Sequence, residues 1–396
     1  MRRLLFALAA LGAASPALAQ ALKPDEVLSS ISVAPISTPN PVLGADGRVH
    51  LAYELLVTNP SKLFVTLDKV EAVDPQSGPV YGLDGDALGA MLSAYAGGGR
   101  TVPPGGSAAV FLDVTFPGDA KLPERVLARV LATRHAAGPD GKPVPMPADA
   151  PLPTTFSFTG APSGIGKPAV VIAPPLRGKG WVTINGCCDS ITSHRGAIMA
   201  VNGQLRVPER FAIDFVQLNG DDRLFTGDVH ALKSYAYFGA PVHSVAVGTV
   251  VNLYDGTGEQ VPGGAAKGIN PENIGGNMLV IDIGGGNFAF YAHLQPGSLK
   301  VKLGDKVKAG DVIGLLGNTG NSTAPHLHFH VMDGPSPLDA NGLPYVFTAF
   351  QSQGVVQIDG ADFFDKPVAA AIDRHRLDGP RQNALPLNNE VVDFGP

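Results

Sequence analysis

Hydrophobic and polar positions in the first 160 residues form short blocks that favour β-strands over helices. The block 49–59 mixes β-branched and aromatic residues and ends in the turn signal Asn59-Pro60. Further strand candidates, separated by turns rich in proline, glycine and aspartate, cover 64–70, 108–116 and 126–133. Short strands at this spacing predict an antiparallel β-sandwich, which we expect to be Ig-like.

The second half of the chain also shows strand patterns and no long helical period. Residues 240–251 predict a strand pair, 278–283 with 287–294 a hairpin, and 301–314 a strand and turn pair. The last predicted strand is 326–332. We therefore expect a mostly β protein throughout.

Stretches rich in proline, glycine and aspartate indicate the domain organisation. One of them covers 138–153, and we place a boundary near 165. This predicts a sandwich module over 20–165, a β-rich domain over 166–350 and a C-terminal extension over 351–396 that packs on that domain. We expect the apolar end of the extension to dock as an edge strand.

The first 19 residues have the order of a secretory signal peptide. Arg2 and Arg3 precede an apolar run over 4–14, and small residues at 17–19 precede Gln20. We expect cleavage near Ala19/Gln20 and a periplasmic or secreted protein. No later stretch reaches the roughly 18 apolar residues of a membrane helix, so no membrane span is expected after cleavage.

Composition and charge narrow the classes of function. The formal net charge is -6, and lysine and arginine form no basic stripe, so we expect no nucleic acid as a partner. Only two cysteines occur, Cys187 and Cys188, which excludes a disulfide-stapled scaffold and a thiolate cage. Any metal must therefore be held mainly by histidine and carboxylate.

The last predicted strand carries the most distinctive chemistry. His326, His328 and His330 alternate there with apolar residues, so in a strand the three imidazoles share one face. Imidazoles two positions apart are close enough for one to bind a metal while the other acts on water bound to it. Three of the chain's 10 histidines within five positions favour a functional face over an incidental one.

The segment 319–329 resembles the signature of the lysostaphin/LytM-type zinc endopeptidases, which cleave cell-wall peptides with a β-rich domain of duplicated hybrid motif fold. Three further segments resemble the family's motifs in the required order. Residues 211–215 resemble its aspartate segment, 290–294 its Tyr-x-His-Leu motif and 301–314 its Gly-Asp-x-Val turn. The resemblance covers about 190–350, under half of the chain.

The resemblance implies one zinc ion (Zn²⁺) held in part by Asp214 and His328, with His293 and His326 flanking its water. His326 would be the general base, and His293 would assist or stabilise the oxyanion, or the two roles would be reversed. The implied protein is an exported zinc metalloendopeptidase. Its substrates would be peptidoglycan cross-links or stem peptides, or another peptide, and a regulatory protein could be a second partner.

The third ligand departs from the family's pattern. The family usually has a histidine four positions before the aspartate, where this chain has Arg210. We expect His194 to supply the ligand across an intervening loop, with His230 and His243 as rivals. His330 occupies a position where the family commonly has a carboxylate, and we expect it beside the ligands or partly exposed.

The adjacent cysteines, Cys187 and Cys188, lie shortly before His194. A disulfide between them would close a small ring and stiffen the loop that carries His194, and we favour this state. Two free thiols, extra metal ligands or an intermolecular bridge are the alternatives.

Two other classes of function compete with the peptidase. A catalytically inactive LytM-like activator or scaffold is favoured by Arg210 and opposed by the four family residues named above. A biotinyl- or lipoyl-type carrier would need a lysine at a hairpin tip, where the chain offers only Lys267 in a glycine-rich loop. The carrier would also leave the histidine face unexplained, so we favour the peptidase.

Overall fold

Strands make up nearly all of the regular structure. The computed structural model describes residues 26–358 and 362–396, and these contain one short α-helix, α1 (Gly85–Ala90). The prediction of a mostly β protein is therefore confirmed. No helix in the described ranges is long and apolar enough to cross a membrane. The signal peptide predicted for the first 19 residues lies outside them.

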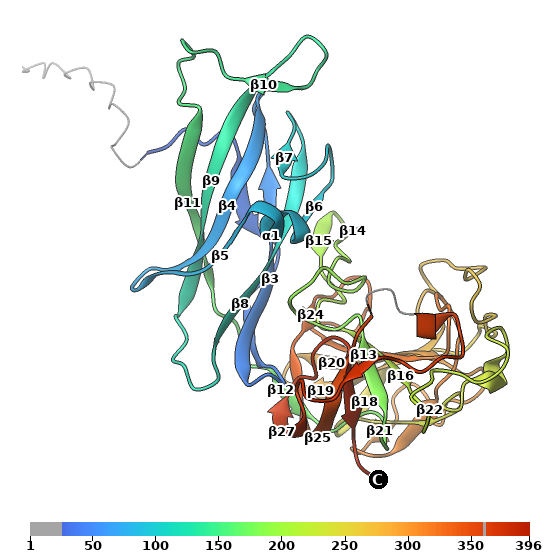
Figure 1. The fold of residues 1–396 in the computed structure, drawn as a ribbon. Coiled ribbons are helices and arrows are strands. Elements are labelled where there is room, and N and C mark those ends of the chain that lie inside the picture. Colours follow the sequence, from blue (N-terminus) through green and yellow to red (C-terminus); the bar gives the residue numbers. More distant parts are fainter. Residues whose placement is uncertain (1–25, 359–361) are drawn as a thin grey trace, which may run out of the picture.

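Two antiparallel sheets form the N-terminal part, whose long strands rise away from the rest of the chain (Figure 1). The first sheet contains β1 (Ser32–Pro35), β2 (Asn40–Leu43), β3 (Arg48–Thr58), β6 (Leu92–Ala94) and β8 (Ser107–Pro117). The second contains β4 (Phe64–Asp74), β5 (Gly78–Asp84), β7 (Thr101–Val102), β9 (Arg125–Ala137), β10 (Pro143–Pro145) and β11 (Thr155–Gly164). Alternate side chains of β3, such as Leu51 and Tyr53, share one core with Val65 and Leu67 of β4. The two sheets thus form a sandwich; its Ig-like character stays a prediction.

A large sheet organises the second part of the chain, in the order β12-β25-β28-β13-β16-β23-β20-β19-β18-β21. Its strands are β12 (Val170–Ile172), β13 (Trp181–Ile184), β16 (Ile213–Gln217), β18 (Gly248–Tyr254), β19 (Asn277–Gly284), β20 (Asn287–Leu294), β21 (Lys306–Val307), β23 (Leu327–Met332), β25 (Tyr345–Val356) and β28 (Glu390–Asp393). Strands β24 (Gly342–Leu343), β26 (Ile372–Asp373) and β27 (Gly379–Ala384) pair alongside it. The predicted hairpin is present as β19 and β20.

Smaller elements surround this sheet. A hairpin joins β14 (Met199–Val201) to β15 (Gln204–Arg206), and β17 (Pro241–His243) pairs with β22 (Val312–Leu315). Two 3₁₀ turns cover Leu232–Ser234 and Asp362–Phe364. The strands found within 240–251, β17 and β18, pair with other strands and not with each other.

Two expectations about the C-terminal region were wrong. The histidine strand β23 is not the last strand, because β25 and β28 follow it in the same sheet. The apolar C-terminal segment is an interior strand and not an edge strand, since β28 lies between β25 and β13 and buries Val391 and Val392. Strand β25 also runs across residue 351, where the C-terminal extension was predicted to begin. The domain boundaries themselves stay predictions.

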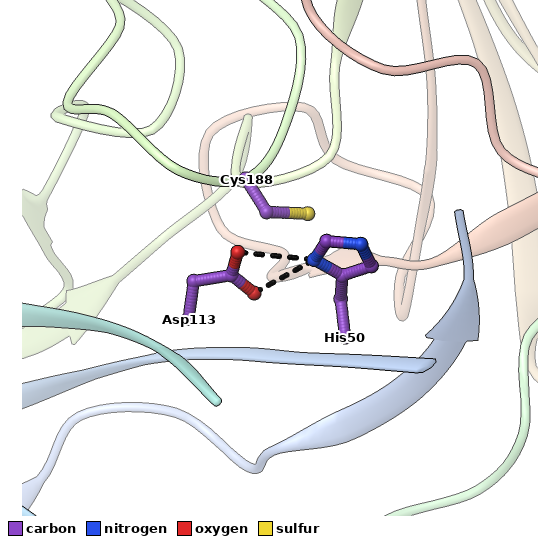
Figure 2. A group of neighbouring side chains, drawn as sticks. All are labelled: His50, Asp113 and Cys188. Atoms are coloured by element: carbon purple, nitrogen blue, oxygen red, sulfur yellow. Dashed lines mark hydrogen bonds and ion pairs between the residues drawn. The ribbon is translucent and has the colours of Figure 1, made fainter. Parts of the chain in front are cut away.

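A buried polar cluster joins the sandwich to the second part. His50 on β3 places Nδ1 3.0 Å from both carboxylate oxygens of Asp113 on β8, and its Nε2 lies 3.2 Å from Asp46. Figure 2 shows Cys188, from the second part, beside this pair. Although these residues lie close enough to share an ion, Cys188 is bonded to Cys187. The favoured disulfide is therefore present, and the Cys188 sulfur is not a thiolate ligand.

The proton on His50 gives the fold a pH-dependent stability. Burial alone would lower the pKa of His50, but Asp113 and Asp46 outweigh burial and raise the pKa to about 9. In the unfolded chain the pKa is about 6.5, so the stabilisation is complete below about pH 6.5 and is lost as pH rises through about 9. Across this window we expect the free energy of unfolding to fall by roughly 1–3 kcal/mol, and His50→Gln to remove most of the fall. Urea denaturation of the wild type and of His50→Gln at several pH values measures the free energy of unfolding of each. If that free energy changed equally with pH in the two proteins, the assignment to His50 would be wrong.

Candidate metal centre

Three neighbouring strands of the large sheet bring the predicted site residues together. Asp214 on β16 is the register partner of His328 on β23, and His328 is in turn the partner of Ala292 on β20. Side chains directly opposite on adjacent strands have Cβ atoms about 4.5–5.5 Å apart. His293 follows Ala292 at the end of β20. The pairing of the sheet therefore gathers residues that are up to 114 positions apart in the chain.

The strand β23 alternates as its sequence predicts. Leu327, Phe329 and Val331 are fully buried in the main core, while His328 and His330 occupy the opposite face. His330 is only 1% exposed, so of the two expectations for it, a place beside the ligands is correct and partial exposure is not. Burial of the apolar face in the core holds the strand in place. Because successive side chains alternate, the imidazoles then point to the other side of the sheet.

The three predicted metal ligands form one cluster. His194 Nε2 lies 3.2 Å from Asp214 Oδ2, and His328 Nδ1 lies 3.0 Å from Asp214 Oδ1. Each residue offers a ligand atom, and these atoms lie within 4.8 Å of one another. His194 comes from the loop between β13 and β14 and is buried.

The other candidates for the third position lie elsewhere. His230 makes a hydrogen bond from its ring to the carbonyl of Pro262, and His243 makes one to the carbonyl of Gly310. Neither belongs to the cluster found among the described residues. Arg210, four positions before the aspartate, donates instead to Ser37 in the N-terminal part.

Hydrogen bonds determine which ring nitrogen faces the carboxylate. His194 Nδ1 lies 3.1 Å from the carbonyl oxygen of Ala212, which can only accept, so the lone pair of the neutral ring is on Nε2. His328 is turned the other way, with Nε2 2.9 Å from His330 Nδ1 and Nδ1 toward Asp214. For Nδ1 to bind a metal, the proton of His328 must sit on Nε2 and be donated to His330. Two imidazole nitrogens and a carboxylate are a donor set that suits zinc.

The electrostatics of the cluster favour added positive charge. Burial would raise the pKa of Asp214, but His194 and His326 outweigh it and lower the pKa well below its usual value. Burial would likewise lower the pKa of His194, yet Asp214 raises it to about 9. A partly buried carboxylate that retains protons on nearby imidazoles is also a suitable site for a divalent cation, which would replace those protons.

Two further imidazoles stand at the edge of the cluster. The rings of His293 and His326 have centroids 4.5 Å apart, and His326 Nε2 lies 3.4 Å from Asp214 Oδ1. Each ring is hydrogen-bonded through Nδ1 to a backbone carbonyl oxygen. His293 Nδ1 lies 2.7 Å from the oxygen of Thr319, and His326 Nδ1 lies 2.8 Å from that of Ala324. In both neutral rings Nε2 is therefore unprotonated and can accept a proton or a hydrogen bond.

The backbone at His293 adopts an unusual conformation. Its φ is 63°, in the left-handed region that costs a non-glycine residue roughly 1–3 kcal/mol. Burial, followed by the charges of His326 and His328, lowers the pKa of His293 well below its usual value. The ring is thus held neutral in a fixed position.

The cluster lies in a cleft with a volume of about 400 Å³. Its walls include Met199 from the β14–β15 hairpin, Phe290, and Leu338 from the loop opposite the hairpin. An ion pair between Arg206 and Asp339, 3.0 Å apart, ties the hairpin to that loop. The cleft is therefore lined by apolar side chains together with the histidine cluster and other polar groups.

Two residues of the site were missed in the sequence. Asn185 donates from Nδ2 to Asp214 Oδ2 at 2.9 Å, and Glu209 lines the cleft. Asn185 begins an Asn-Gly turn signal, but nothing in the local pattern points to an aspartate 29 residues away. Glu209 has no distinguishing signal at all.

Comparison with known proteins identifies part of the chain. Residues 230–340 match the model of Peptidase family M23. Glycyl-glycine endopeptidase ALE-1 of Staphylococcus capitis is 49% identical over 59 residues, 15% of this chain and 16% of that protein. Peptidoglycan DD-endopeptidase ShyA of Vibrio cholerae is 43% identical over 65 residues, 16% of this chain and 15% of that protein. The matches thus span about a sixth of these relatives' lengths.

A solved structure, the catalytic domain of lysostaphin from Staphylococcus simulans, is 25% identical and covers 43% of this chain and 88% of that one, with a TM-score of 0.21. The segment matched by the family model contains His293, His326 and His328. His194 and Asp214 lie before it, so two of the three candidate ligands come from outside the matched segment.

Proposed function

Because the chain carries a domain of peptidase family M23, we propose that it is an exported zinc metalloendopeptidase that hydrolyses peptide bonds in peptidoglycan cross-links or stem peptides. The observation that carries the proposal is the donor cluster of two buried histidines and the partly buried Asp214, beside two imidazoles with unprotonated Nε2 atoms. Relatives named for glycyl-glycine and peptidoglycan endopeptidase activity support the substrate class. Export rests on the predicted signal peptide.

Each side chain has a separate task in this proposal. His194 through Nε2, Asp214, and His328 through Nδ1 would hold one zinc ion. When bound, the ion would polarise the scissile carbonyl and activate a water molecule. The remaining steps are proton transfers and orientation by the chain's own residues.

His326 is the better proton acceptor of the two imidazoles. Its Nε2 faces Asp214 Oδ1 at 3.4 Å. In the metal-free protein burial lowers the pKa of His326, but that carboxylate outweighs burial and raises the pKa above its usual value. His326 Nε2 would take a proton from the attacking water and return it to the leaving amine. His293 stays neutral and would orient that water by accepting a hydrogen bond at Nε2.

The cleft, with a volume of about 400 Å³, would hold part of an extended peptide over the cluster. Met199, Phe290 and Leu338 offer it apolar contacts, and Glu209 and Asn321 offer polar groups. The inactive scaffold alternative is not favoured, because His194 places a donor nitrogen 3.2 Å from Asp214 although Arg210 occupies the usual ligand position. A regulatory protein partner remains part of the proposal.

Digestion of purified peptidoglycan tests the proposal. Sacculi are incubated with the full-length protein after removal of metal by a chelator, and again after zinc is restored, and released fragments are identified by mass spectrometry. We expect new peptide amino termini only with zinc. No release from sacculi of several cross-link types or from a peptide library, with zinc bound, would rule out the peptidase.

A further inference from the structure

The loop that carries His194 packs on the N-terminal sandwich. Ile191 and Ile198, on either side of the histidine, contact the sandwich core and not the core of the large sheet. The same loop begins with the disulfide, whose Cys188 faces the His50–Asp113 pair (Figure 2). His194 is therefore held between contacts that the sandwich provides.

Arg195 links this loop to the sandwich through a hydrogen bond. Its side chain is 1% exposed, although it follows His194 directly. One guanidinium nitrogen donates to the carbonyl of Leu112 on β8 at 2.7 Å, and another donates to the carbonyl of Cys188. The guanidinium carbon also lies 5.8 Å from the centre of the Phe111 ring. Arg195 thus connects the sandwich, the disulfide and His194.

Arg210 makes a second link, beside the strand that carries Asp214. Its side chain is 2% exposed, and Nη1 donates to Ser37 Oγ at 2.6 Å and to the carbonyl of Thr38 at 2.9 Å. Nη1 also lies 3.8 Å from the buried carboxylate of Glu54 on β3. Buried charges of this kind need partners. Most partners of Arg210 belong to the N-terminal part, and one, the carbonyl of Gly342 on β24, belongs to the second part.

We propose that the N-terminal sandwich is a structural part of the metal centre, and that Arg195 and Arg210 are positioning residues that hold His194 and Asp214 in place. This inference rests on the proposed zinc-binding function. A ligand on a loop loses conformational freedom when it binds a metal, and a loop ordered in advance avoids that cost. We call the contacts of Arg195 and Arg210 with the sandwich the brace. It matters here because Arg210 stands four positions before Asp214, so the third ligand, His194, comes from a loop.

Zinc affinity of full-length variants tests the brace. We expect Arg195→Met to weaken zinc binding by about 10- to 100-fold, the usual effect of losing a group that orients a ligand. Arg195→Lys, which can reach one carbonyl, should fall between this variant and the wild type. Competition with a chromogenic chelator measures the dissociation constants, and the absorption spectrum of the Co²⁺-loaded protein reports whether all three ligands are engaged.

Arg134→Met is the matched control. Arg134 is also buried and also donates to carbonyls, those of Leu28 and Pro153, but within the N-terminal part. It should alter stability while leaving zinc affinity and the Co²⁺ spectrum unchanged. Hydrogen exchange in the metal-free proteins should be faster at 191–198 in Arg195→Met than in the wild type.

Ile198→Ala keeps the test decisive if Arg195→Met does not fold. It removes a partly buried contact with the sandwich, and we expect a smaller loss of zinc affinity than in Arg195→Met.

His194→Ala distinguishes failure of the brace from failure of the ligand assignment. Loss of zinc in His194→Ala with wild-type affinity in the folded brace variants would overturn the brace alone. Wild-type affinity in His194→Ala would overturn the ligand assignment on which the brace depends.

Discussion

Replacing His194 with alanine is expected to release zinc and abolish peptide hydrolysis. The histidine supplies one of three donor atoms around Asp214, and a catalytic zinc site typically has three protein ligands. We expect zinc affinity to fall by at least about 100-fold, more than for a residue that only orients a ligand. Loss of the ion should lower kcat/KM by at least about a thousandfold, because its effect on the transition state is worth several kcal/mol.

The rival histidines provide the controls for this prediction. His230→Ala and His243→Ala remove imidazoles whose hydrogen bonds go to backbone carbonyls away from the cluster, so both variants should keep zinc and activity. Zinc content after dialysis and hydrolysis of a peptide substrate are measured for all three proteins. Full zinc occupancy in His194→Ala, or its loss in either rival, would show that the ligand set is misassigned.

His326→Ala is expected to separate metal binding from catalysis. Its Nε2 faces the cluster but its Nδ1 is held by the carbonyl of Ala324, which suits a proton carrier. The variant should bind zinc like the wild type and lose roughly 10²- to 10⁴-fold in kcat, the usual contribution of general base catalysis. Measurements at saturating substrate, with zinc content determined on the same samples, test both parts.

A second substitution at the same position sharpens the test. His326→Gln keeps a polar side chain but has no basic nitrogen, so it should be nearly as inactive as His326→Ala. His293→Ala should have a smaller effect, because that ring is assigned only to orient water. Wild-type activity in His326→Gln would refute proton transfer by His326, and loss of zinc from it would identify His326 as a ligand.

Local patterns in the sequence determined much of the site. The alternation of histidines with Leu327, Phe329 and Val331 predicted their two faces, because the backbone of a strand turns successive side chains to opposite sides. The β-rich class and the β19–β20 hairpin followed from equally local signals. The resemblance to a family added Asp214 and His293, which the structure places beside His328.

The third position shows where local information ended. Arg210 was known to occupy the usual ligand position, but His194 could be preferred only as the nearest upstream histidine, and His243 set back only because it lies in an apolar strand. The structure places His194 Nε2 at 3.2 Å from Asp214. The path of a loop depends on the contacts that its apolar and charged side chains make. In this loop Ile191, Ile198 and Arg195 contact the sandwich.

The sequence by itself therefore determined the β class, the histidine face and the motif residues, since each depends on neighbours a few positions apart. Only the tertiary structure decided which histidine joins Asp214, that β28 is an interior strand, and that Arg210 points to Glu54. The physical reason is that these contacts join segments far apart in the chain. A buried guanidinium takes the position where its charge is paired and its hydrogen bonds are made. The hydrophobic periodicity of the sequence does not indicate which distant residues provide those partners.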